Sequence, residues 1–435
     1  MKNKNFVIQP IYDDAWPFSE GLALVKFNGK YGFIDEKENF VIEPKYNNAC
    51  LFSEGLIAVK FNKKWGYIDK NGNFVIELKY DNAWPFSEGL AIVKLNKKYG
   101  FIDKKGNIVI EPKYDGAWSF SEGLAAIYLN DKWGYIDRTG KCIVEPKYKP
   151  VSDFSEGLAK VKLNGKEGLI DKTGNYVIEP RYDAIKDFFN GLARIKVHNK
   201  YGFIDKKGNL IIQPKYDYAG DFHEGLAVVG ISGYFSTKYG FIDTKGNYII
   251  QPIYDFAWAF SEGLAPVELN DKWGFIDKKG NLIIRPKYDT AYSFFEGLAV
   301  VGIGEFPNTK YGFIDTKGNL VIQPKYDKAY PFFKALALVE IDGKWGFINA
   351  KGNIVVCPKY DEIGNFFEGF AQVRLNKKWG YIDKNGKLVI PLVCDYISDF
   401  SKGFALVKFN GKYGYIDKNS MQYWKKSNAI KEKET

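Results

Sequence analysis

The stretch that decides the fold reads Lys272-Trp273-Gly274-Phe275-Ile276-Asp277-Lys278-Lys279-Gly280-Asn281-Leu282-Ile283-Ile284-Arg285-Pro286-Lys287-Tyr288-Asp289, and versions of it occur twelve times in the 435 residues of the chain. Trp273 and Phe275 alternate with Gly274 and Ile276. This period of two predicts a β-strand with both aromatic rings on one face. The glycine contributes no packing of its own, so its recurrence indicates that a neighbouring ring or backbone approaches closely.

Turn residues separate this strand from the neighbouring strands on both sides. Residues 277–281 combine an aspartate with a glycine, as tight turns do, and a β-branched strand follows and ends at Pro286. Upstream, residues 264–269 run into a hairpin connection, which reads Asn28-Gly29 or Asn410-Gly411 in other copies. Each copy is therefore predicted to be a three-stranded antiparallel meander. The segment 288–297 is predicted to be a loop whose apolar residues cover one end of the sheet.

The copies follow one another at an almost constant spacing. Nine of the eleven spacings between consecutive anchor glycines are 34 residues, and the two from Gly202 to Gly240 and from Gly274 to Gly312 are 38 residues. A fixed period of this size is typical of a repeat architecture. We predict an all-β tandem array over residues 1–417. For residues 418–435 we predict a C-terminal cap and charged tail, in which Tyr423 and Trp424 cap the last sheet and residues 431–435 are frayed.

The chain starts and ends out of phase with the repeat. Residues 6–10 form a third strand without a first or second, and the last copy supplies a first and a second strand without a clear third. Closing twelve face-packed sheets about 10 Å apart would leave a wide central channel that nothing in the sequence obviously fills. We therefore expect an open, curved or superhelical array. The alternative is a closed propeller-like ring that is zipped by the N-terminal strand.

The two lengthened repeats differ from the others at one place, the hairpin between the first and second strands. They read Gly230-Ile231-Ser232-Gly233-Tyr234-Phe235-Ser236-Thr237 and Gly302-Ile303-Gly304-Glu305-Phe306-Pro307-Asn308-Thr309. An aromatic side chain on a projecting hairpin can anchor a partner. Tyr234, Phe235 and Phe306 are therefore the candidate partner-binding residues. The alternative is that these loops merely tolerate insertions and that the rings fold back onto neighbouring strands.

The formal net charge of +10 suggests nucleic acid or an anionic surface as a partner, but its distribution argues against both. Lysines recur in the turns of every copy, and an acidic residue recurs in nearly every loop. This pattern is typical of solvated turns and protected sheet edges. On sequence grounds we therefore expect no nucleic-acid partner. The chain contains no stretch of the length and hydropathy of a signal peptide or a membrane span, so we expect a cytoplasmic location.

Reaction chemistry is not recognisable in the sequence. The two histidines, His198 and His223, occupy a hairpin tip and a loop, and no motif places a nucleophile beside them. Carboxylates recur in the copies, as Asp35, Asp69 and Asp103 and as Glu20, Glu54 and Glu88, which favours a turn-capping role over a catalytic pair. The four cysteines are spread singly, without the spacing of a metal site or a disulfide framework. We expect no enzymatic activity, no cofactor and no metal.

The motif Lys-Trp-Gly-Phe-Ile-Asp-x-x-Gly, followed by Ile-x-Pro-x-Tyr-Asp and Phe-Ser-Glu-Gly-Leu-Ala, resembles the bacterial WG-repeat family. The match covers residues 5–417 with all segments in order. Six copies carry tyrosine in place of the family's tryptophan, and Glu167 departs further, which puts the packing of its copy in doubt. The resemblance implies β-rich tandem repeats of mostly unassigned biochemical role, and it supplies no catalytic residues.

From these observations we expect a non-enzymatic scaffold that presents a long surface to another protein. The alternative is a protein that binds a polysaccharide or a cell-envelope glycan through exposed aromatic rings.

Overall fold

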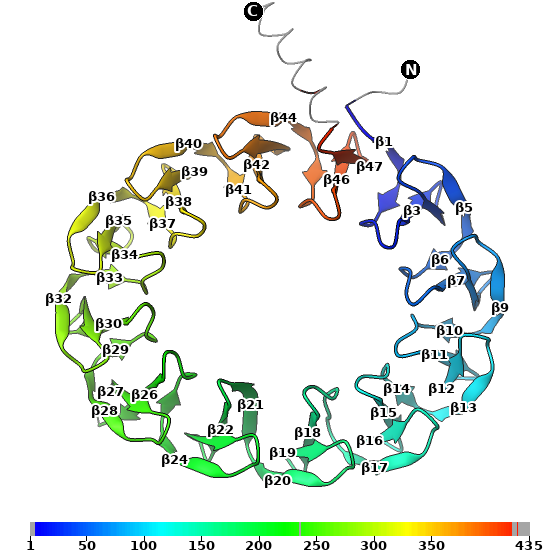
Figure 1. Ribbon diagram of the computed structural model, residues 1–435, viewed down its shortest axis with the longest axis horizontal. Helices are drawn as coiled ribbons and strands as arrows, with labels where there is room; N and C mark the ends of the chain where they lie inside the picture. Colours follow the sequence, from blue (N-terminus) through cyan, green and yellow to red (C-terminus); the bar gives the residue numbers. More distant parts are fainter. Residues whose placement is uncertain (1–4, 235, 420–423, 425–435) are drawn as a thin grey trace, which may run out of the picture. The chain divides into compact units, whose positions relative to one another are not determined.

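The computed structural model describes residues 5–234, 236–419 and 424. The chain divides into two compact units: unit 1 comprises residues 1–164, 169–176 and 364–435, and unit 2 comprises residues 165–168 and 177–363. Within the described residues the strands form twelve antiparallel sheets. Figure 1 shows that, in each unit, consecutive sheets lie side by side, with the third strands along one side of the unit and the loops along the other. No helix among these residues has the length and hydropathy needed to cross a membrane.

Each regular sheet contains four strands, where the sequence predicted three. The extra one is an opening strand, which lies in the predicted loop and pairs with the first strand of the next copy. The opening strands are β2 (Asp14–Ala15), β6 (Asn48–Ala49), β10 (Asn82–Ala83), β14 (Gly116–Ala117), β21 (Ala184–Phe189), β25 (Tyr218–Ala219), β29 (Phe256–Ala257), β33 (Thr290–Ala291), β37 (Lys328–Ala329), β41 (Glu362–Ile363) and β45 (Tyr396–Ile397). The first strands are β3 (Ala23–Phe27), β7 (Ile57–Phe61), β11 (Leu90–Leu95), β15 (Leu124–Leu129), β18 (Leu158–Leu163), β22 (Leu192–Val197), β26 (Leu226–Ser232), β30 (Leu264–Leu269), β34 (Leu298–Ile303), β38 (Leu336–Ile341), β42 (Phe370–Leu375) and β46 (Phe404–Phe409).

The second strands lie where the repeat predicts them, but the predicted end of the third strand at Pro286 is wrong. β32 (Leu282–Tyr288) extends past Pro286, and Tyr288 pairs with Trp273 across an irregularity. The orphan strand predicted at residues 6–10 lies at Ile8–Tyr12. The second strands are β4 (Lys30–Ile34), β8 (Lys64–Ile68), β12 (Lys98–Asp103), β16 (Lys132–Asp137), β19 (Lys166–Asp171), β23 (Lys200–Asp205), β27 (Thr237–Asp243), β31 (Lys272–Asp277), β35 (Lys310–Asp315), β39 (Lys344–Asn349), β43 (Lys378–Asp383) and β47 (Lys412–Asp417). The third strands are β5 (Phe40–Tyr46), β9 (Phe74–Tyr80), β13 (Ile108–Tyr114), β17 (Cys142–Tyr148), β20 (Tyr176–Tyr182), β24 (Leu210–Tyr216), β28 (Tyr248–Tyr254), β32 (Leu282–Tyr288), β36 (Leu320–Tyr326), β40 (Ile354–Tyr360), β44 (Leu388–Cys394) and β1 (Ile8–Tyr12).

The anchor glycine allows the second and third strands to approach across an irregular pairing. In β31 and β32, Trp273 pairs with Tyr288 and Phe275 pairs with Ile284, so Gly274 alone faces three residues of the partner strand. A Cβ atom on Gly274 would lie 2.4 Å from the Ile284 carbonyl oxygen and 2.7 Å from the Pro286 nitrogen. The close approach that the sequence indicated is confirmed, and the neighbouring group is backbone.

The core lies between consecutive sheets. One cluster joins Phe275 and Ile284 of one sheet to Phe294 and Val301 of the next, and the ring centroids of Phe275 and Phe294 are 4.9 Å apart. Both strand aromatics contact this cluster, as expected for two rings on one face of the strand. Phe275 is fully buried, whereas Trp273 is only half-buried.

Acidic residues of the repeat act at two kinds of place. The carboxylate of Asp277 accepts hydrogen bonds from the backbone N–H groups of Lys279 (2.9 Å) and Asn281 (2.8 Å), which confirms its predicted turn-capping role. The loop glutamate has a different role, because Glu262 accepts a hydrogen bond from the backbone N–H of Gly297 in the next copy at 2.9 Å. Glutamates of this kind therefore join consecutive loops.

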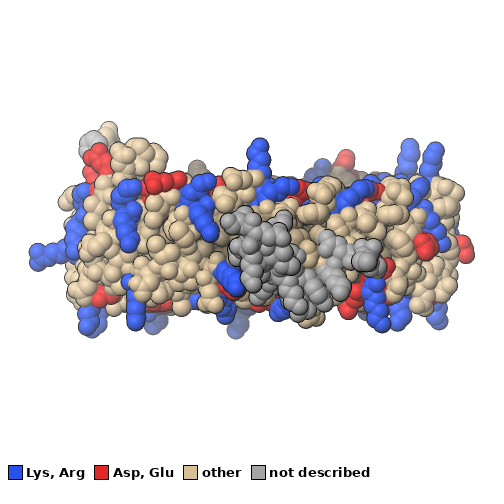
Figure 2. All heavy atoms as spheres, turned by 90° about the horizontal axis from the view of Figure 1, so that it is seen from above, with Lys and Arg blue, Asp and Glu red and all other residues tan. Residues whose placement is uncertain are grey.

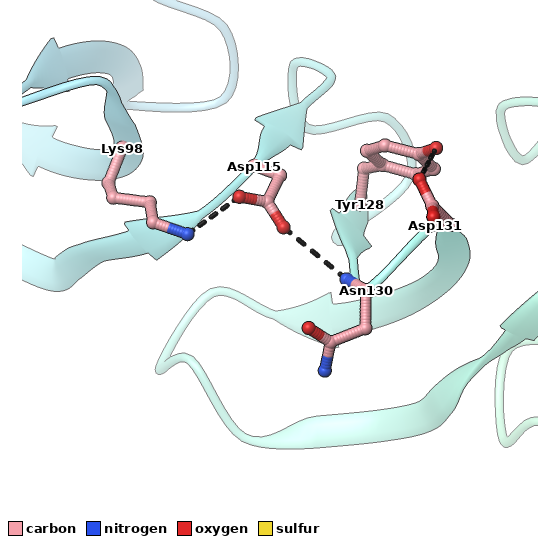
Figure 3. A network of polar contacts seen from close by, with 5 residues as sticks. All are labelled: Lys98, Asp115, Tyr128, Asn130 and Asp131. Atoms are coloured by element: carbon pink, nitrogen blue, oxygen red, sulfur yellow. Dashed lines mark hydrogen bonds and ion pairs between the residues drawn. The ribbon is translucent and has the colours of Figure 1, made fainter.

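A second aspartate, the one that follows the third strand, joins consecutive sheets. In Figure 3, Asp115 Oδ1 accepts a hydrogen bond from Lys98 Nζ at 2.6 Å, and its Oδ2 accepts one from the backbone N–H of Asn130 at 3.3 Å. Lys98 belongs to the sheet of β13, and Asn130 lies at the hairpin of the next sheet. The hydrogen bond from Lys98 and that from Asn130 hold the pKa of Asp115 below its usual range.

The two ends of the chain meet in one sheet of unit 1. The strand order is β1-β47-β46-β45, with Ile8 paired to Tyr415. The open array that we expected is therefore wrong at its ends, and the terminal pairing of the closed alternative is confirmed. The physical reason is that β47 has a free edge that matches a third strand, and residues 8–12 supply the missing copy of that strand.

The contacts of this terminal sheet repeat those between consecutive sheets elsewhere. Lys412 Nζ donates to Asp13 Oδ1 at 2.5 Å, the hydroxyl of Tyr415 donates to the Trp16 carbonyl at 2.6 Å, and the rings of Phe18 and Tyr415 are 5.0 Å apart. The corresponding pairs in other sheets are Lys98 with Asp115, the Tyr67 hydroxyl with the Trp84 carbonyl, and Phe275 with Phe294. The joint between the chain ends thus has the chemistry of an internal joint.

Departures from the repeat have local consequences. The copy that contains Lys149 and Pro150 has no opening strand among the described residues, and Val151 forms only an isolated bridge to Val161. Glu167, whose packing the sequence left in doubt, accepts a hydrogen bond from the backbone N–H of Ile185 at 2.8 Å. A charged side chain thus replaces the usual aromatic residue by bonding to a backbone group.

Trp424 contacts the N-terminal segment, and the C-terminal cap itself stays a prediction. Its indole N–H donates to the Asn5 carbonyl at 2.8 Å, and its ring packs on Phe6 with centroids 5.5 Å apart. Tyr423 and residues 431–435 lie outside the described residues. The boundary at residue 417 between array and tail stays a prediction.

We expect Gly274→Ala to lower the free energy of unfolding by about 2–3 kcal/mol, because the added methyl group would overlap backbone atoms of β32. Urea denaturation followed by tryptophan fluorescence measures the change. Gly220→Ala is the matched control, since a Cβ there would lie 3.8 Å from its nearest neighbour. Equal stability of the two variants would contradict the role of the close approach.

Deleting residues 1–12 should expose the amides of β47, because β1 is its hydrogen-bonded neighbour. We expect faster amide hydrogen exchange at Tyr415 and Ile416 than in a control chain that lacks only residues 1–4. Exchange that stays as slow as in the control would mean that β1 does not close the terminal sheet in solution.

Stability should fall in acid. Hydrogen bonds from lysine lower the pKa of Asp81, Asp115, Asp289 and Asp395 below the ordinary 3.8. A carboxyl whose folded pKa is depressed stabilises the protein fully above its unfolded pKa and loses that contribution as the pH falls through the folded value. Urea midpoints measured from about pH 6 to about pH 2 should therefore drop below about pH 4. A midpoint that is constant over this range would show that these joints contribute nothing.

Candidate functional site

The lengthened hairpins are held firmly at their bases. In the first, between β26 and β27, Ser232 pairs with Thr237, and the Gly233 backbone N–H donates to the Ser236 carbonyl at 2.8 Å. The Ser232 backbone N–H also donates to Asp217 Oδ2 at 2.8 Å, which is the same sheet-joining contact that Asp115 makes. The hairpin is thus an extension of a regular sheet.

The second lengthened hairpin, between β34 and β35, is fixed by equivalent bonds. The Gly304 backbone N–H donates to Asp289 Oδ2 at 2.8 Å, and the Thr309 hydroxyl donates to the Gly304 carbonyl at 2.8 Å. Within the tip, the Asn308 backbone N–H donates to the Glu305 carbonyl at 2.8 Å. Both hairpins belong to unit 2, in sheets separated by the sheet β29–β32.

The aromatic side chains at the hairpin tips stand outside the core. Tyr234 is 98% exposed and Phe306 is 93% exposed. The alternative in which these two rings fold back onto neighbouring strands is therefore not what the structure shows. Phe235, the third candidate residue, lies outside the described residues. The binding role of all three stays a prediction.

A shallow groove lies beside the first hairpin. Ile231, Gly233, Ser236 and Lys238 line it from the hairpin side, and Tyr248, Gln251 and Pro252 line it from β28. The groove therefore combines apolar surface with a lysine and an amide beside the first lengthened hairpin.

An aromatic cluster that the sequence analysis missed lies at the base of the same hairpin. It consists of Tyr218, Tyr239, Phe256, Trp258 and Trp273. Tyr239 and Phe256 have ring centroids 4.9 Å apart, and Phe256 lies 5.2 Å from Trp258 and 5.9 Å from Trp273. Tyr218 packs on Tyr239 at 5.5 Å. Tyr218 is 41% exposed and Trp258 is 46% exposed, so part of the cluster faces solvent.

A residue-by-residue comparison of the repeat copies could have predicted this cluster. Tyr218 and Phe256 occupy the first position of the opening strand, where other copies carry residues such as Asn48, Asn82 and Thr290. Large aromatic residues occupy that position in three copies, at Tyr218, Phe256 and Tyr396, and the first two are consecutive and lie next to a lengthened hairpin. The sequence analysis compared insertions between copies and did not compare this position.

Other exposed apolar side chains follow the repeat. Phe295, Phe333 and Phe367 replace the serine of the Phe-Ser-Glu-Gly loop and are 46%, 60% and 50% exposed. The serine in regular copies has a joining role, since the Ser261 hydroxyl donates to the Phe294 carbonyl at 2.7 Å. These copies therefore lose a hydrogen bond to the next sheet and gain apolar surface.

The two histidines contact an aromatic ring and an aspartate. The ring of His223 packs on Phe189 at 5.1 Å, and His198 lies on a hairpin, where its backbone N–H donates to Asp183 Oδ2 at 2.6 Å. Among the residues that the structure describes, no group of three or more His, Cys, Asp or Glu side chains could hold a metal ion. The four cysteines are free, with Cys394 buried and Cys357 exposed.

Charged side chains show no concentration of one sign in the view of Figure 2. Lys and Arg are spread over the visible surface, with Asp and Glu among them. Many turn lysines pair with acidic residues, as Lys278 does with Glu224 at 2.9 Å and Lys104 with Glu54 at 3.1 Å. The lysines thus serve as joints as well as solvated turn residues.

The family model of the WG-containing repeat matches the chain at residues 2–31, 31–65, 65–99, 99–133, 133–166, 168–201, 201–235, 239–273, 273–305, 311–345, 345–379 and 379–413. The chain belongs to the WG-repeat family. The resemblance noted in the sequence is thereby confirmed for twelve repeats. A comparison with curated protein sequences gave no match.

Several solved structures share features of this WG-repeat protein at low sequence identity. A eukaryotic initiation factor has 14% identity and a TM-score of 0.31, and the match covers 67% of this chain and 92% of that one. The extracellular domain of a hybrid two-component system from B. thetaiotaomicron has 9% identity and a TM-score of 0.25, with 94% and 75% covered. The tricorn protease has 10% identity and a TM-score of 0.31, with 95% and 61% covered.

Proposed function

We propose that this WG-repeat protein is a non-enzymatic scaffold that binds another protein through the lengthened hairpins of unit 2. The observation that carries the proposal is the near-complete exposure of Tyr234 and Phe306 on hairpins whose bases are fixed by hydrogen bonds. An aromatic ring held in water by an ordered backbone gains more from burial against a partner than a ring on a mobile chain, because less ordering entropy is lost on binding.

The surface area that a specific interface needs supports a partner that covers several sheets. Full burial of an aromatic side chain removes about 150–250 Å² from water, so two rings contribute only part of a specific interface of about 800 Å² per partner. The groove at Ile231 and Tyr248 and the half-exposed aromatic cluster add surface at the first hairpin. A folded protein or a long peptide could contact all of them.

A second candidate is the binding of a polysaccharide or a cell-envelope glycan. It is favoured by Trp258, Tyr292 and Tyr330, which occupy equivalent positions in three consecutive sheets and are 46%, 42% and 52% exposed. Aromatic rings at regular intervals could serve as stacking platforms for sugars. A glycan array probed with the full chain and with Trp258→Ala would test this candidate, and binding that depends on Trp258 would favour it over protein binding.

We expect the triple substitution of Tyr234, Phe235 and Phe306 to serine to abolish capture of protein partners without lowering the melting temperature, since Tyr234 and Phe306 contribute almost no buried surface. Affinity purification followed by mass spectrometry measures the capture, and calorimetry measures the melting.

The matched control replaces Phe295, Phe333 and Phe367 with serine, which removes the same number of exposed rings at another place. Loss of capture in the hairpin variant alone supports the proposed surface. Equal capture by both variants and the parent chain would refute it, and a lowered melting temperature of the hairpin variant would show that these rings belong to the packing.

A further inference from the structure

In the sheets whose second strand carries the anchor aromatic residue, that residue pairs with a residue of the first strand. In many copies this neighbour is a cation that lies over the ring. The nitrogen of Lys94 is 4.8 Å from the Tyr99 ring centroid, and that of Lys408 is 4.9 Å from the Tyr413 ring centroid. The guanidinium of Arg374 lies 5.6 Å from the Trp379 ring centroid. These distances are those of cation–π contacts.

Four consecutive copies lack this cation. The first-strand position holds Gly230, Glu268, Gly302 and Glu340 instead. At Gly230 there is no space for a side chain, because a Cβ atom would lie 3.0 Å from Tyr218 Cβ and 2.9 Å from Thr237 Cγ2. The loss of the cation is therefore built into the packing around the first lengthened hairpin.

One of these copies restores the cation from another strand. Lys328, on the opening strand β37, forms an ion pair with Glu340 at 2.8 Å, and its nitrogen lies 5.5 Å from the Trp345 ring centroid. Glu340 is 8% exposed, so this carboxylate is neutralised in a nearly buried place. A glutamate, a tryptophan and a lysine thus form a complete set in the sheet β37–β40.

The sheet β29–β32 has the same glutamate and the same tryptophan but lacks the lysine. Glu268 and Trp273 take the places of Glu340 and Trp345, and Phe256 takes the place of Lys328. Glu268 is only half-buried, and it lies opposite Trp273 in the strand pairing. Burial first, and the nearby charges of Asp255 and Asp271 second, raise the pKa of Glu268. Its negative charge is therefore incompletely stabilised by its own surroundings.

Other charges near Glu268 do not fill the position of the missing lysine. Asp255 is occupied by Lys238 at 2.5 Å and by the backbone N–H of Asn270 at 2.8 Å. Lys238 also lines the groove beside the first hairpin. Phe256 pairs directly with Glu268, and Trp258 packs on Phe256 with ring centroids 5.2 Å apart.

We propose that Glu268, with Phe256, Trp258 and Trp273, binds an arginine side chain of the partner, and that the partner segment is a basic peptide lying along the first lengthened hairpin. This inference rests on the proposed protein-binding function and names the chemistry of the partner. A planar guanidinium can stack on an aromatic face while it donates two hydrogen bonds to one carboxylate, which a lysine cannot do in the same geometry. The carboxylate accounts for the charge of the ligand, and the rings account for its flat shape.

The test uses the full chain and a capped heptapeptide, Gly-Ser-Arg-Tyr-Arg-Ser-Gly, in isothermal titration calorimetry at low salt. A second peptide carries citrulline, the neutral isostere, in place of both arginines. We expect binding of the arginine peptide and at least tenfold weaker binding of the citrulline peptide. Glu268→Gln should weaken the arginine peptide at least fivefold. Glu268→Lys, which installs the cation found at Lys94 and Lys408, should abolish its binding.

The control variant Glu77→Lys makes the same change in net charge on an exposed position of β9 and should bind the arginine peptide like the parent chain. Equal binding of arginine and citrulline peptides, or unchanged binding by both Glu268 variants, would overturn the inference. Binding of cellotetraose with no binding of the arginine peptide would overturn it in favour of a glycan site. If the arginine peptide fails while the hairpin variant still loses protein capture, the proposed function stands and only this inference falls.

Discussion

The close approach between the anchor glycine and the third strand is the constraint on which the rest of the structure depends. Three residues of the third strand face Gly274 alone, and this is possible because no side chain stands between Gly274 and the backbone of residues 284–286. The irregular pairing also accommodates Pro286, whose nitrogen has no proton to give to a regular strand pair. It ends with Tyr288 buried and with Asp289 in position to reach the next sheet. The Trp-Gly and Pro-x-Tyr-Asp parts of the motif are thus two sides of one contact.

Repetition turns this local contact into a continuous structure. Each sheet contributes a lysine, a serine or a glutamate to a neighbouring copy, and each of these polar joints is exposed enough to stabilise the fold only slightly. The apolar cores between sheets contribute more, because rings such as Phe275 and Phe294 pack face to edge in full burial. Since β1 gives the last sheet the same set of joints, neither end of the chain leaves a second strand unpaired at its edge.

Sequence reasoning could find the parts of this fold that depend on neighbours along the chain. The strands, turns and hairpins follow from alternation and turn chemistry, and Asp277 caps its turn as the pattern indicates. Contacts between copies were harder to predict. The opening strand of two residues, such as Thr290–Ala291, is too short to show a period of two. The sequence could not decide how the array ends either, because the orphan third strand predicted at residues 6–10 is required by a closed array and permitted by an open one.

The candidate site, like the fold, could be predicted from the sequence only in part. The insertions at Tyr234 and Phe306 were visible because they change the repeat length, whereas the exposure of these rings could only come from coordinates. The aromatic cluster and the missing cation change no length. They become visible when equivalent positions of different sheets are compared. Lys94 lies over the Tyr99 ring, whereas Glu268 stands at the equivalent position opposite Trp273, where no cation lies over the ring from the first strand. In a repeat protein the regular copies thus act as internal controls. Glu268 has the opposite charge to Lys94 at the equivalent position, and it lies beside exposed rings and a lengthened hairpin. Other copies show that a lysine can occupy this position in the same fold. Packing alone therefore does not require Glu268, and that is the reason to look for its role in binding.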